Sequence, residues 1–450
     1  MSWAHEEMAG AALGDRRLSA RAASLLDTLG AKPTLSIPAA ARGWAETQAA
    51  YRFFDHNNVS AQSVLAPHIE RTLERARAQR VVLAVQDTTE LDFTGKDDIE
   101  GLGPLTYAAQ RGLHLHPTFL VTPERVPLGV FDTWLWARDP ETFAQKRNTH
   151  GPIEDKESVR WLQGYQRLGE VAGELPETRL VYLADREADI YELFVAATDS
   201  PVELLVRAKH NRALLEQGHL REKLAAAPAL GSVTFTLPKS AERPTRTVTQ
   251  SLRAARVSIR APSGKANLAP SVALTAILAE ETDPPAGTAP VQWLLLTTLP
   301  VECFEQACEL LQWYLCRWEI ELLFKVLKSG CEVEKLQLEN LDRLEPAIAL
   351  YLIIAWRVML LRMTARDCPE LPCDVVFETE EWRAIYIVSQ RAPPPDRPPP
   401  LDTIVRMLAG FGGFLNRTHD GPPGNKSIWI GLQRTRDFVL ALAAYDASGP

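Results

Sequence analysis

The sequence is poor in features that would place it in several common protein classes. Its six cysteines include no Cys-x-x-Cys pair and have no histidine nearby at zinc-ligand spacing, which argues against a disulfide framework or a zinc site. No uninterrupted apolar run approaches the roughly 18 residues that a membrane-spanning helix needs. The first ten residues also lack the basic start and apolar stretch of a signal peptide. We therefore expect a cytoplasmic protein with reduced thiols and no membrane partner.

Nucleotide-binding loops are absent as well. The segment GFGGF at 410–414 lacks a spaced third glycine, and GNKS at 424–427 has Asn425 where a phosphate loop needs glycine before lysine. We expect no nucleotide cofactor.

Positive charge is scarce overall but concentrated in one segment. The net charge is −8, which taken alone argues weakly against nucleic acid as a partner. Between Leu205 and Lys265, however, twelve lysines and arginines stand against three glutamates, which makes this segment +9. Such a segment is either the footprint of a polyanion or only a charged surface, and charge alone does not decide between them.

Residues 1–80 have the pattern of short helices separated by turns. In the segment GDRRLSAR, Asp15 is placed to cap a helix that carries Arg16, Arg17 and Arg21 close to its start. Backbone amides at a helix start favour phosphate, so these arginines are candidate phosphate contacts. The alternative is an ordinary surface helix with solvated arginines.

Two apolar segments of strand length each end in an aspartate. Val81 to Val85 leads into Asp87, and Arg179 to Ala184 leads into Asp185. The segment 155–173 between them predicts a helix that DKES caps. A strand, a helix and a second strand form a right-handed crossover, which places Asp87 and Asp185 side by side at the carboxyl ends of neighbouring parallel strands.

The remaining strands fall into two groups. Segments 113–122 and 126–136 predict a meander, in which His114 and His116 share one face. Without a third ligand nearby, packed or hydrogen-bonded histidines explain this pair better than a metal site does. From 231 to 300, short strands alternate with Pro, Ser and Gly and predict an all-β insertion, with Trp293 near its end.

One long helix is predicted from Val301 to Ser329, because this run contains neither proline nor glycine. At about 100° per residue, one stripe of the helix carries Tyr314, Arg317, Trp318, Glu321, Lys325 and Lys328. A carboxylate among cations suits a metal-bound phosphodiester. The alternative is a solvated face with a Glu321–Lys325 pair that contributes a few tenths of a kcal/mol.

The C-terminal part is predicted to be helical. The segment 347–364 is the most apolar helix of the chain, and the proline-rich run 391–400 is predicted to be a linker. Helices are expected at 401–408 and 432–445.

Taken together, these segments resemble the cut-and-paste DDE transposases of bacterial insertion sequences, in particular the hairpin-forming branch with a Tyr-x2-Arg-x3-Glu-x6-Lys motif. That motif stands here as Tyr314, Arg317, Glu321 and Lys328. The two aspartates are framed as QDTTELDF and ADREADI, and WLLLTTLPVE precedes the predicted Glu321 helix. Further likeness extends from LGDRRLSAR through VRAKH to GGFLNR.

The resemblance implies an α/β fold with a ribonuclease H-like catalytic core. It implies a helical domain at residues 1–72 that binds transposon-end DNA. The core would then span residues 73–370, with the all-β insertion at about 213–300, and residues 371–450 would form a helical dimerisation region. The implied partners are double-stranded DNA, as transposon ends and as target, and a second copy of the chain in a synaptic complex. When bound to DNA, the protein would be associated with the nucleoid.

The resemblance also implies a chemistry. Asp87, Asp185 and Glu321 would hold two Mg²⁺ or Mn²⁺ ions that activate water or a DNA 3′-hydroxyl for in-line attack on phosphorus. In related enzymes the freed 3′-hydroxyl forms a hairpin end, which requires a flipped base that Trp293 and Trp318 would stack or brace. The residues expected to contact DNA are Tyr314, Arg317, Lys325, Lys328, Trp293, Trp318, Arg207, Lys209, Arg186, Arg16, Arg17 and Arg21.

Two other functions are consistent with parts of this pattern. A catalytically silent copy would bind transposon ends without cutting, although all three carboxylates are present. A structure-specific endonuclease on a ribonuclease H-like core would need neither the β insertion nor the terminal helical regions. Cleavage confined to terminal repeats separates the transposase from the endonuclease.

Overall fold

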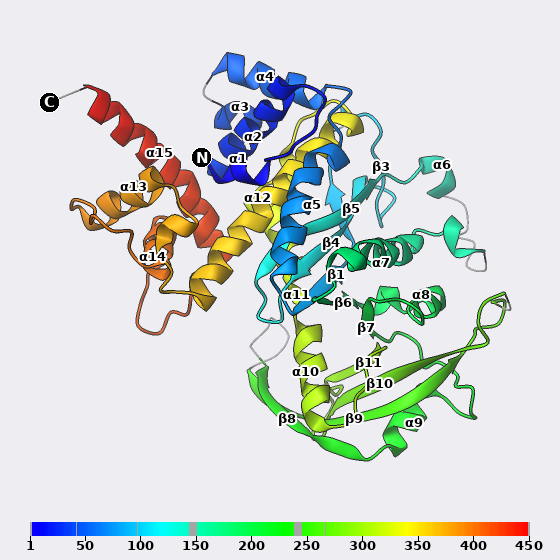
Figure 1. The fold of residues 1–450 in the computed structure, drawn as a ribbon. Helices are drawn as coiled ribbons and strands as arrows, with labels where there is room; N and C mark the ends of the chain where they lie inside the picture. Colours follow the sequence, from blue (N-terminus) through cyan, green and yellow to red (C-terminus); the bar gives the residue numbers. More distant parts are fainter. Residues whose placement is uncertain are drawn as a thin grey trace. The chain divides into compact units, whose positions relative to one another are not determined.

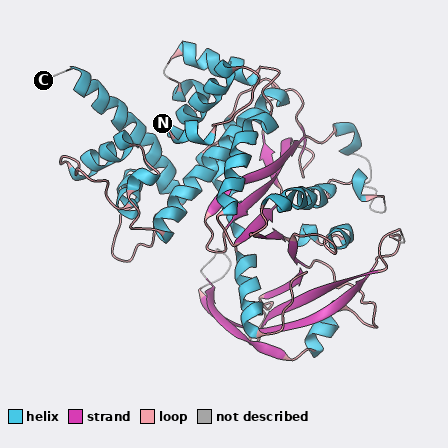
Figure 2. Ribbon diagram, viewed as in Figure 1, coloured by secondary structure: helices cyan, strands magenta, loops and turns pink. Residues whose placement is uncertain are grey.

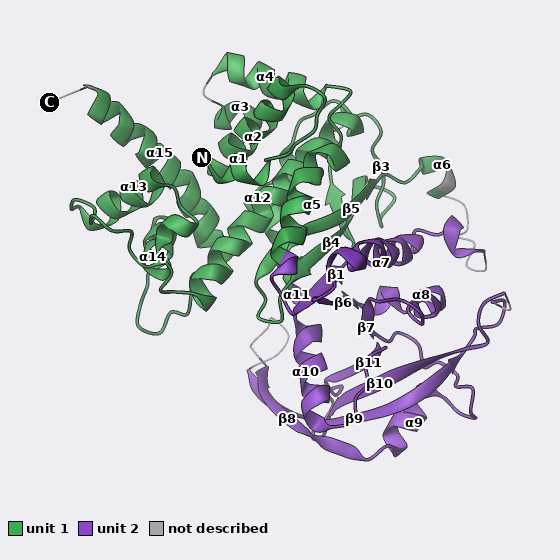
Figure 3. Cartoon of the chain, viewed as in Figure 1, with its two compact units in different colours: residues 1–75, 88–146, 319–450 green, residues 76–87, 147–318 purple. Residues whose placement is uncertain are grey.

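A computed structural model describes residues 2–41, 43–96, 98–143, 151–237, 245–265 and 267–448 of the chain. The chain forms two compact units (Figure 3). Unit 1 comprises residues 1–75, 88–146 and 319–450, and unit 2 comprises residues 76–87 and 147–318. Helices and strands occur in both units, so the fold is mixed α/β with helical N- and C-terminal parts (Figures 1 and 2).

Unit 1 begins with the predicted short helices. These are α1 (Trp3–Glu7), α2 (Arg16–Ala31), α3 (Ile37–Ala40), α4 (Trp44–Phe54) and α5 (Ala61–Arg77). The Asp15 cap is confirmed, because its carboxylate accepts a hydrogen bond from the backbone amide of Arg17 at 2.7 Å.

The predicted meander is confirmed within unit 1. Its antiparallel strands are β2 (Thr89–Asp92), β3 (Gly103–Pro104), β4 (Arg111–Val121) and β5 (Pro127–Trp136), with β4 pairing to each of the others. His114 and His116 on β4 are buried against aromatic rings of β5. His116 Nδ1 also lies 2.8 Å from the Thr88 hydroxyl. Both histidines are thus packed against aromatic rings, and His116 is also hydrogen-bonded.

The core of unit 1 is built around α12 (Leu341–Asp367), which carries the apolar segment 347–364. By length and composition α12 is the helix of the described residues that could cross a membrane, but 89% of its apolar window is buried inside the structure. Its burial among other elements makes it a core helix.

The C-terminal helices of unit 1 are α13 (Thr379–Gln390), α14 (Leu401–Phe411) and α15 (Asn425–Ser448), which pack on one another. Sequence patterning did not predict α13, and it placed the start of α15 seven residues too late. Residues 391–400 form neither helix nor strand, as expected of the proline-rich linker.

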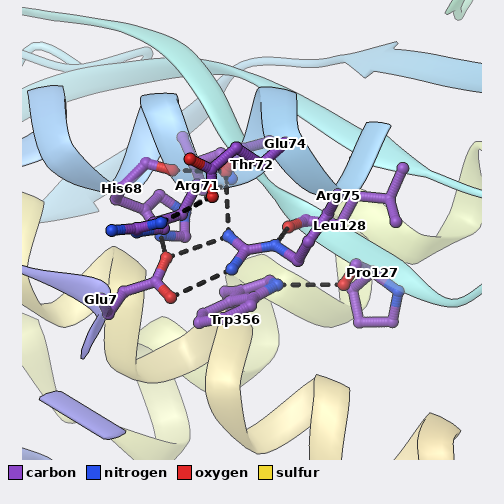
Figure 4. A network of polar contacts seen from close by, with 10 residues as sticks. Glu7, His68, Arg71, Thr72, Glu74, Arg75, Pro127, Leu128 and Trp356 are labelled. Atoms are coloured by element: carbon purple, nitrogen blue, oxygen red, sulfur yellow. Dashed lines mark hydrogen bonds and ion pairs between the residues drawn. The ribbon is translucent and has the colours of Figure 1, made fainter. Parts of the chain in front are cut away.

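A buried polar network joins α1 to the core of unit 1 (Figure 4). The Glu7 carboxylate accepts hydrogen bonds from Arg75 at 2.9 and 3.0 Å and from His68 Nδ1. His68 Nε2 accepts a hydrogen bond from the backbone amide of Val130 at 2.9 Å, so His68 is neutral with its proton on Nδ1. The Arg75 guanidinium lies 4.3 Å from the centre of the Trp356 ring on α12.

Unit 2 contains a mixed sheet. Its strands follow the order β1 (Val81–Gln86), β6 (Arg179–Ala184), β7 (Glu203–Arg207), β11 (Gln292–Thr297), β10 (Ser271–Glu281), β9 (Arg246–Arg260) and β8 (Ala229–Leu237). Pairing is parallel from β1 to β7 and antiparallel from β7 to β8. The β insertion therefore extends the sheet that carries the two aspartates.

The helices of unit 2 correct three predictions. The crossover helix is α7 (Val159–Val171), preceded by a 3₁₀ turn at Ile153–Asp155, and Ser158 makes no side-chain cap, so the predicted DKES cap is wrong. The insertion expected at about 213–300 is not all-β, since it contains α9 (Leu220–Ala226), whereas the described residues of the stretch 231–300 form strands and no helix. The single helix predicted from Val301 to Ser329 is also wrong.

That run is divided into α10 (Phe304–Leu315), α11 (Trp318–Lys325) and a π-helical turn at Val326–Gly330. The division has a local cause. The amides of Cys316 and Arg317 bond to carbonyls three residues back, which tightens the last turn of α10 and ends the α-helical spacing. The residues of the predicted stripe therefore stand on three successive elements of the chain and not on one α-helix.

Candidate active site

The two aspartates occupy the positions that the crossover predicts. In β1 and β6, Val85 pairs with Leu183, so the register continued by two residues sets Asp87 beside Asp185. In β6 and β7, Ala184 pairs with Val206, which sets Arg207 on the other side of Asp185. The carboxyl ends of three parallel strands thus carry two carboxylates and a guanidinium in one row.

Asp87 is held by an arginine of the same unit. Arg317 NH1 lies 2.9 Å from Asp87 Oδ2, and both side chains are largely buried. Beneath them, Tyr182 donates a hydrogen bond to Gln86 at 2.7 Å. Burial, with added repulsion from Tyr165 and the two aspartates, raises the pKa of Tyr182, so its phenol stays neutral next to the acidic pair.

Asp185 caps the short 3₁₀ helix that follows β6. Its carboxylate accepts a hydrogen bond from the backbone amide of Glu187 at 2.7 Å. Arg186 is exposed on this turn. The Asp185 carboxylate is therefore oriented by the chain that follows it, while its remaining oxygen keeps free lone pairs for a cation.

Aromatic residues border the acidic pair. Tyr314, near the end of α10, lies 6.4 Å from Trp293 of β11 between ring centres. Burial raises the pKa of Tyr314 to about 12, a shift that Arg317 and Arg207 oppose and Asp185 reinforces. Trp318 is 56% exposed and lies beside the Arg317 guanidinium.

The remaining predicted residues of the motif lie in unit 1. Glu321 and Lys325 are on α11, and Lys328 is on the π-helical turn. Lys328 Nζ lies 3.8 Å from Glu334 Oε1, and the same oxygen accepts a hydrogen bond from the backbone amide of Asp92 at 3.0 Å. Glu334 thereby links the lysine to strand β2.

The acidic residues are chemically suited to a divalent metal, since carboxylate oxygens on adjacent strand ends are the hard ligands that Mg²⁺ prefers. Across the ranges that the structure describes, no group of three or more metal-ligating side chains is close enough to hold an ion. The structure brings Asp87 and Asp185 together in unit 2 and places Glu321 in unit 1.

The basic segment is much less open than its charge count implies. Many of its arginines are engaged within unit 2, as Arg246 is with Glu281, Arg253 with carbonyls at the end of α9, and Arg260 with Leu215. Arg207 also donates to the Gln292 carbonyl at 3.2 Å. By contrast, Lys209 is exposed at the end of β7. Charge count is therefore a poor guide to the DNA-facing surface of this segment.

Sequence reasoning missed Asp189 and Arg212, which shape the segment after β7. Asp189 is buried and receives hydrogen bonds from Arg212 and from two backbone amides of that segment. Asp189 stands in the ADREADI block that frames Asp185. The signal available in the sequence was this aspartate, which precedes an arginine-rich part of the chain, because a buried aspartate needs a charged partner.

Near the N-terminus, Arg16, Arg17 and Arg21 are exposed on the first turns of α2, as a phosphate contact requires. One face of α4 also exposes Trp44, Gln48 and Arg52, spaced four residues apart. Trp44 is 77% exposed. The opposite face of α4 buries Phe53 and Phe54.

Three family models match the chain in succession. The transposase DNA-binding model matches residues 1–59, the transposase DDE domain residues 164–357, and the transposase Tn5 dimerisation domain residues 353–448. Together they support a DNA transposase of the DDE class, one that binds DNA and forms a homodimer. The third match narrows the likeness to transposases of the Tn5 type.

The DDE match is consistent with a ribonuclease H-like core and implies dependence on a divalent metal. Among solved structures, the chain is similar to a piggyBac transposase synaptic complex with hairpin DNA, at 8% identity and a TM-score of 0.32. The similarity covers 68% of this chain and 52% of that one, so the chain spans about half the length of that protein. A likeness this weak adds nothing to the assignment.

Proposed function

We propose that the chain is a cut-and-paste transposase that binds transposon ends, cleaves both DNA strands through a hairpin intermediate and joins the ends to target DNA. The observation that carries the proposal is the row of Asp87, Asp185 and Arg207 at the carboxyl ends of β1, β6 and β7. The domains expected from the sequence, 1–72, 73–370 and 371–450, are kept as the proposed functional parts.

Asp87, Asp185 and Glu321 are the proposed ligands of two divalent metal ions. When bound, such ions polarise the scissile phosphate and stabilise the attacking and leaving oxygens of an in-line displacement. Arg317 NH1 lies 2.9 Å from the Asp87 carboxylate. We assign its guanidinium to the phosphate next to the cleaved bond, because a planar guanidinium matches the geometry of phosphate oxygens.

The surrounding residues orient the DNA strand. Tyr314 stays a neutral phenol at physiological pH, since its pKa of about 12 leaves the proton in place, and it can donate to a phosphate oxygen. Lys328 and Lys325 supply further positive charge. Trp293 next to Tyr314, and the exposed Trp318, are the proposed stacking surfaces for the base that leaves the helix when the hairpin forms.

The end sequence is read by the N-terminal helices in this proposal. Exposed Arg16, Arg17 and Arg21 fit phosphates, which set position without reading sequence. The α4 stripe of Trp44, Gln48 and Arg52 fits base edges, because Gln pairs with adenine and Arg with guanine. Substituting Arg52 is therefore expected to relax end specificity, whereas substituting Arg17 weakens binding to all sequences alike.

The decisive test is cleavage of DNA that carries the terminal repeats of the element, with Mg²⁺ or Mn²⁺ present or withheld. Wild type is expected to give metal-dependent nicked and hairpin-ended products, and Glu321→Ala none. Glu309→Ala on the exposed face of α10 is the matched control and is expected to cleave normally. Specific end binding without cleavage by wild type would instead identify a silent end-binding copy.

A further inference from the structure

The carboxylate of Asp189 is the centre of a buried cluster in unit 2. Its side chain is fully buried, and its ion-pair partner lies on another segment of the chain, not on its own turn. Oδ2 accepts hydrogen bonds from the backbone amides of Lys209 and His210 at 2.7 and 2.8 Å. Oδ1 accepts a hydrogen bond from Arg212 Nε at 2.6 Å. All the contacts come from the segment that follows β7.

Arg212 also bonds back to the backbone of Asp189, and the pair Asp189–Arg212 is here called the clasp. Its NH2 donates back to the backbone carbonyl of Asp189 at 2.6 Å, and its guanidinium lies 5.1 Å from the centre of the Phe194 ring on α8 (Tyr191–Ala196). The Arg212 side chain is 9% exposed. Because both charges are buried and multiply bonded, the clasp fixes the path of residues 208–212.

The clasp ties together the two segments that leave β6 and β7. The segment after β6 begins with Asp185, and the segment after β7 follows Arg207 and presents Lys209 and His210 to solvent. The Ala208 amide also bonds to the Leu294 carbonyl of β11 at 2.7 Å, next to Trp293. The buried clasp thus determines where an exposed lysine stands relative to the acidic pair.

We propose that Asp189 and Arg212 are positioning residues that hold Lys209 and His210 against the phosphates of the DNA strand at the acidic pair. The inference rests on the proposed function, and it adds the residues that position Lys209 and His210, the pair here called the phosphate clamp. A purely structural role predicts that loss of the clasp lowers stability and leaves DNA contacts unchanged. A positioning role predicts a loss of specific phosphate contacts.

A cavity of about 660 Å³ gives the clamp an open side. Asp189, His210 and Arg212 line it, together with Lys156, Lys265 and the Glu192 carboxylate that pairs with Lys265. Open space beside the exposed His210 leaves room for a strand of nucleic acid that passes the segment.

The test compares Asp189→Asn with Glu281→Gln. Glu281 is also a buried carboxylate of unit 2, bonded to Arg246 and to the Val291 amide, but it lies on β10. Binding of duplex DNA is measured over a range of salt concentrations for each folded variant. The logarithm of the affinity falls as the logarithm of the salt concentration rises, and each lost phosphate contact makes this slope less steep by about 0.9. We expect a decrease of about 1 to 2 for Asp189→Asn and no change for Glu281→Gln.

A double-mutant cycle locates the effect. If the clasp acts through Lys209, then Lys209→Ala adds little to Asp189→Asn, whereas Arg17→Ala in the N-terminal helix adds its full effect. Arg212→Lys serves as a second variant should Asp189→Asn fail to fold, since it keeps the charge but loses the paired donors. We expect it to lower the slope in the same direction.

Equal slopes for Asp189→Asn and Glu281→Gln, or full additivity with Lys209→Ala, would overturn the inference. The proposed function is judged separately by wild-type cleavage of terminal-repeat DNA. A wild type that cleaves, with an Asp189→Asn variant that binds as the Glu281→Gln control does, refutes the clasp alone. A wild type that binds duplex DNA but never cleaves refutes the catalytic proposal, while the slopes still report on the clasp.

Discussion

Unit 1 and unit 2 each bury a carboxylate beside an arginine, but the two pairs join different kinds of structure. In unit 1, Glu7 and Arg75 connect helices α1 and α5 and border α12. In unit 2, Asp189 and Arg212 connect two strand-end segments and make hydrogen bonds to backbone amides. The first pair fixes how elements pack, and the second fixes where exposed side chains stand. Substitutions in the first pair should therefore lower stability, whereas substitutions in the second pair should weaken contacts with DNA.

The largest expected effect is on stability, in unit 1. Glu7→Gln removes the charged partner of Arg75, whose side chain is 27% exposed, and should cost about 3 kcal/mol, the low end of the range for breaking a buried pair. Chemical denaturation followed by fluorescence measures this loss. The exposed neighbour Glu6 provides the control Glu6→Gln, for which we expect a change within about 0.5 kcal/mol.

Cleavage by the folded fraction of Glu7→Gln should equal that of wild type, in contrast to Asp189→Asn. A stable Glu7→Gln protein with weakened DNA contacts would reverse the comparison between the two pairs.

The pH dependence of stability tests the same network. Burial alone would raise the pKa of Glu7, but His68 and Arg75 outweigh it and lower the pKa to about 2 from 4.5. The stability that the ionised Glu7 carboxylate contributes is complete above about pH 4.5. It is lost as the pH falls towards 2, and its total is about 3 kcal/mol. Burial lowers the pKa of His68, so the unfolded chain takes up a proton first and stability begins to fall below about pH 6.5.

Denaturation curves at pH 7, 5.5 and 4 distinguish these contributions. His68→Asn should remove the loss that begins below about pH 6.5, and an unchanged pH profile in that variant would show that His68 does not titrate on unfolding.

A smaller loss is expected where the network touches β5. Gly129 has φ 151°, and a Cβ there would lie 1.9 Å from the Thr72 hydroxyl, which itself accepts a hydrogen bond from Arg75. Gly129→Ala should therefore cost about 2–3 kcal/mol through strain and displacement of Thr72. Gly264 in unit 2 has φ 87° with nothing near its Cβ position, so Gly264→Ala should cost only about 1 kcal/mol. Melting temperatures that fall equally would refute the steric argument.

The parts of the candidate site differ in how far the sequence could predict them. Asp87 and Asp185 follow strands joined by a crossover, and a parallel register leaves them one possible arrangement. The break between Tyr314 and Trp318 had no such signal, since no proline or glycine marks it and it depends on a tightened helix end. The Asp189 clasp was missed because its partners lie some twenty residues away, in a segment without regular periodicity.

The smallest expected effect tests whether DNA binding depends on the number of positive charges in the basic segment or on where they stand. Lys209 and Lys223 belong to the same basic segment and are both exposed, but Lys209 stands at the end of β7 and Lys223 on α9. If placement governs DNA contact, Lys209→Ala lowers the salt slope of DNA binding by about 0.9 and Lys223→Ala leaves it unchanged. If the segment acts only through its summed charge, the two variants bind alike at every salt concentration. Because a single lysine contributes so little, the comparison depends on the difference between the paired variants, which share the same change in net charge.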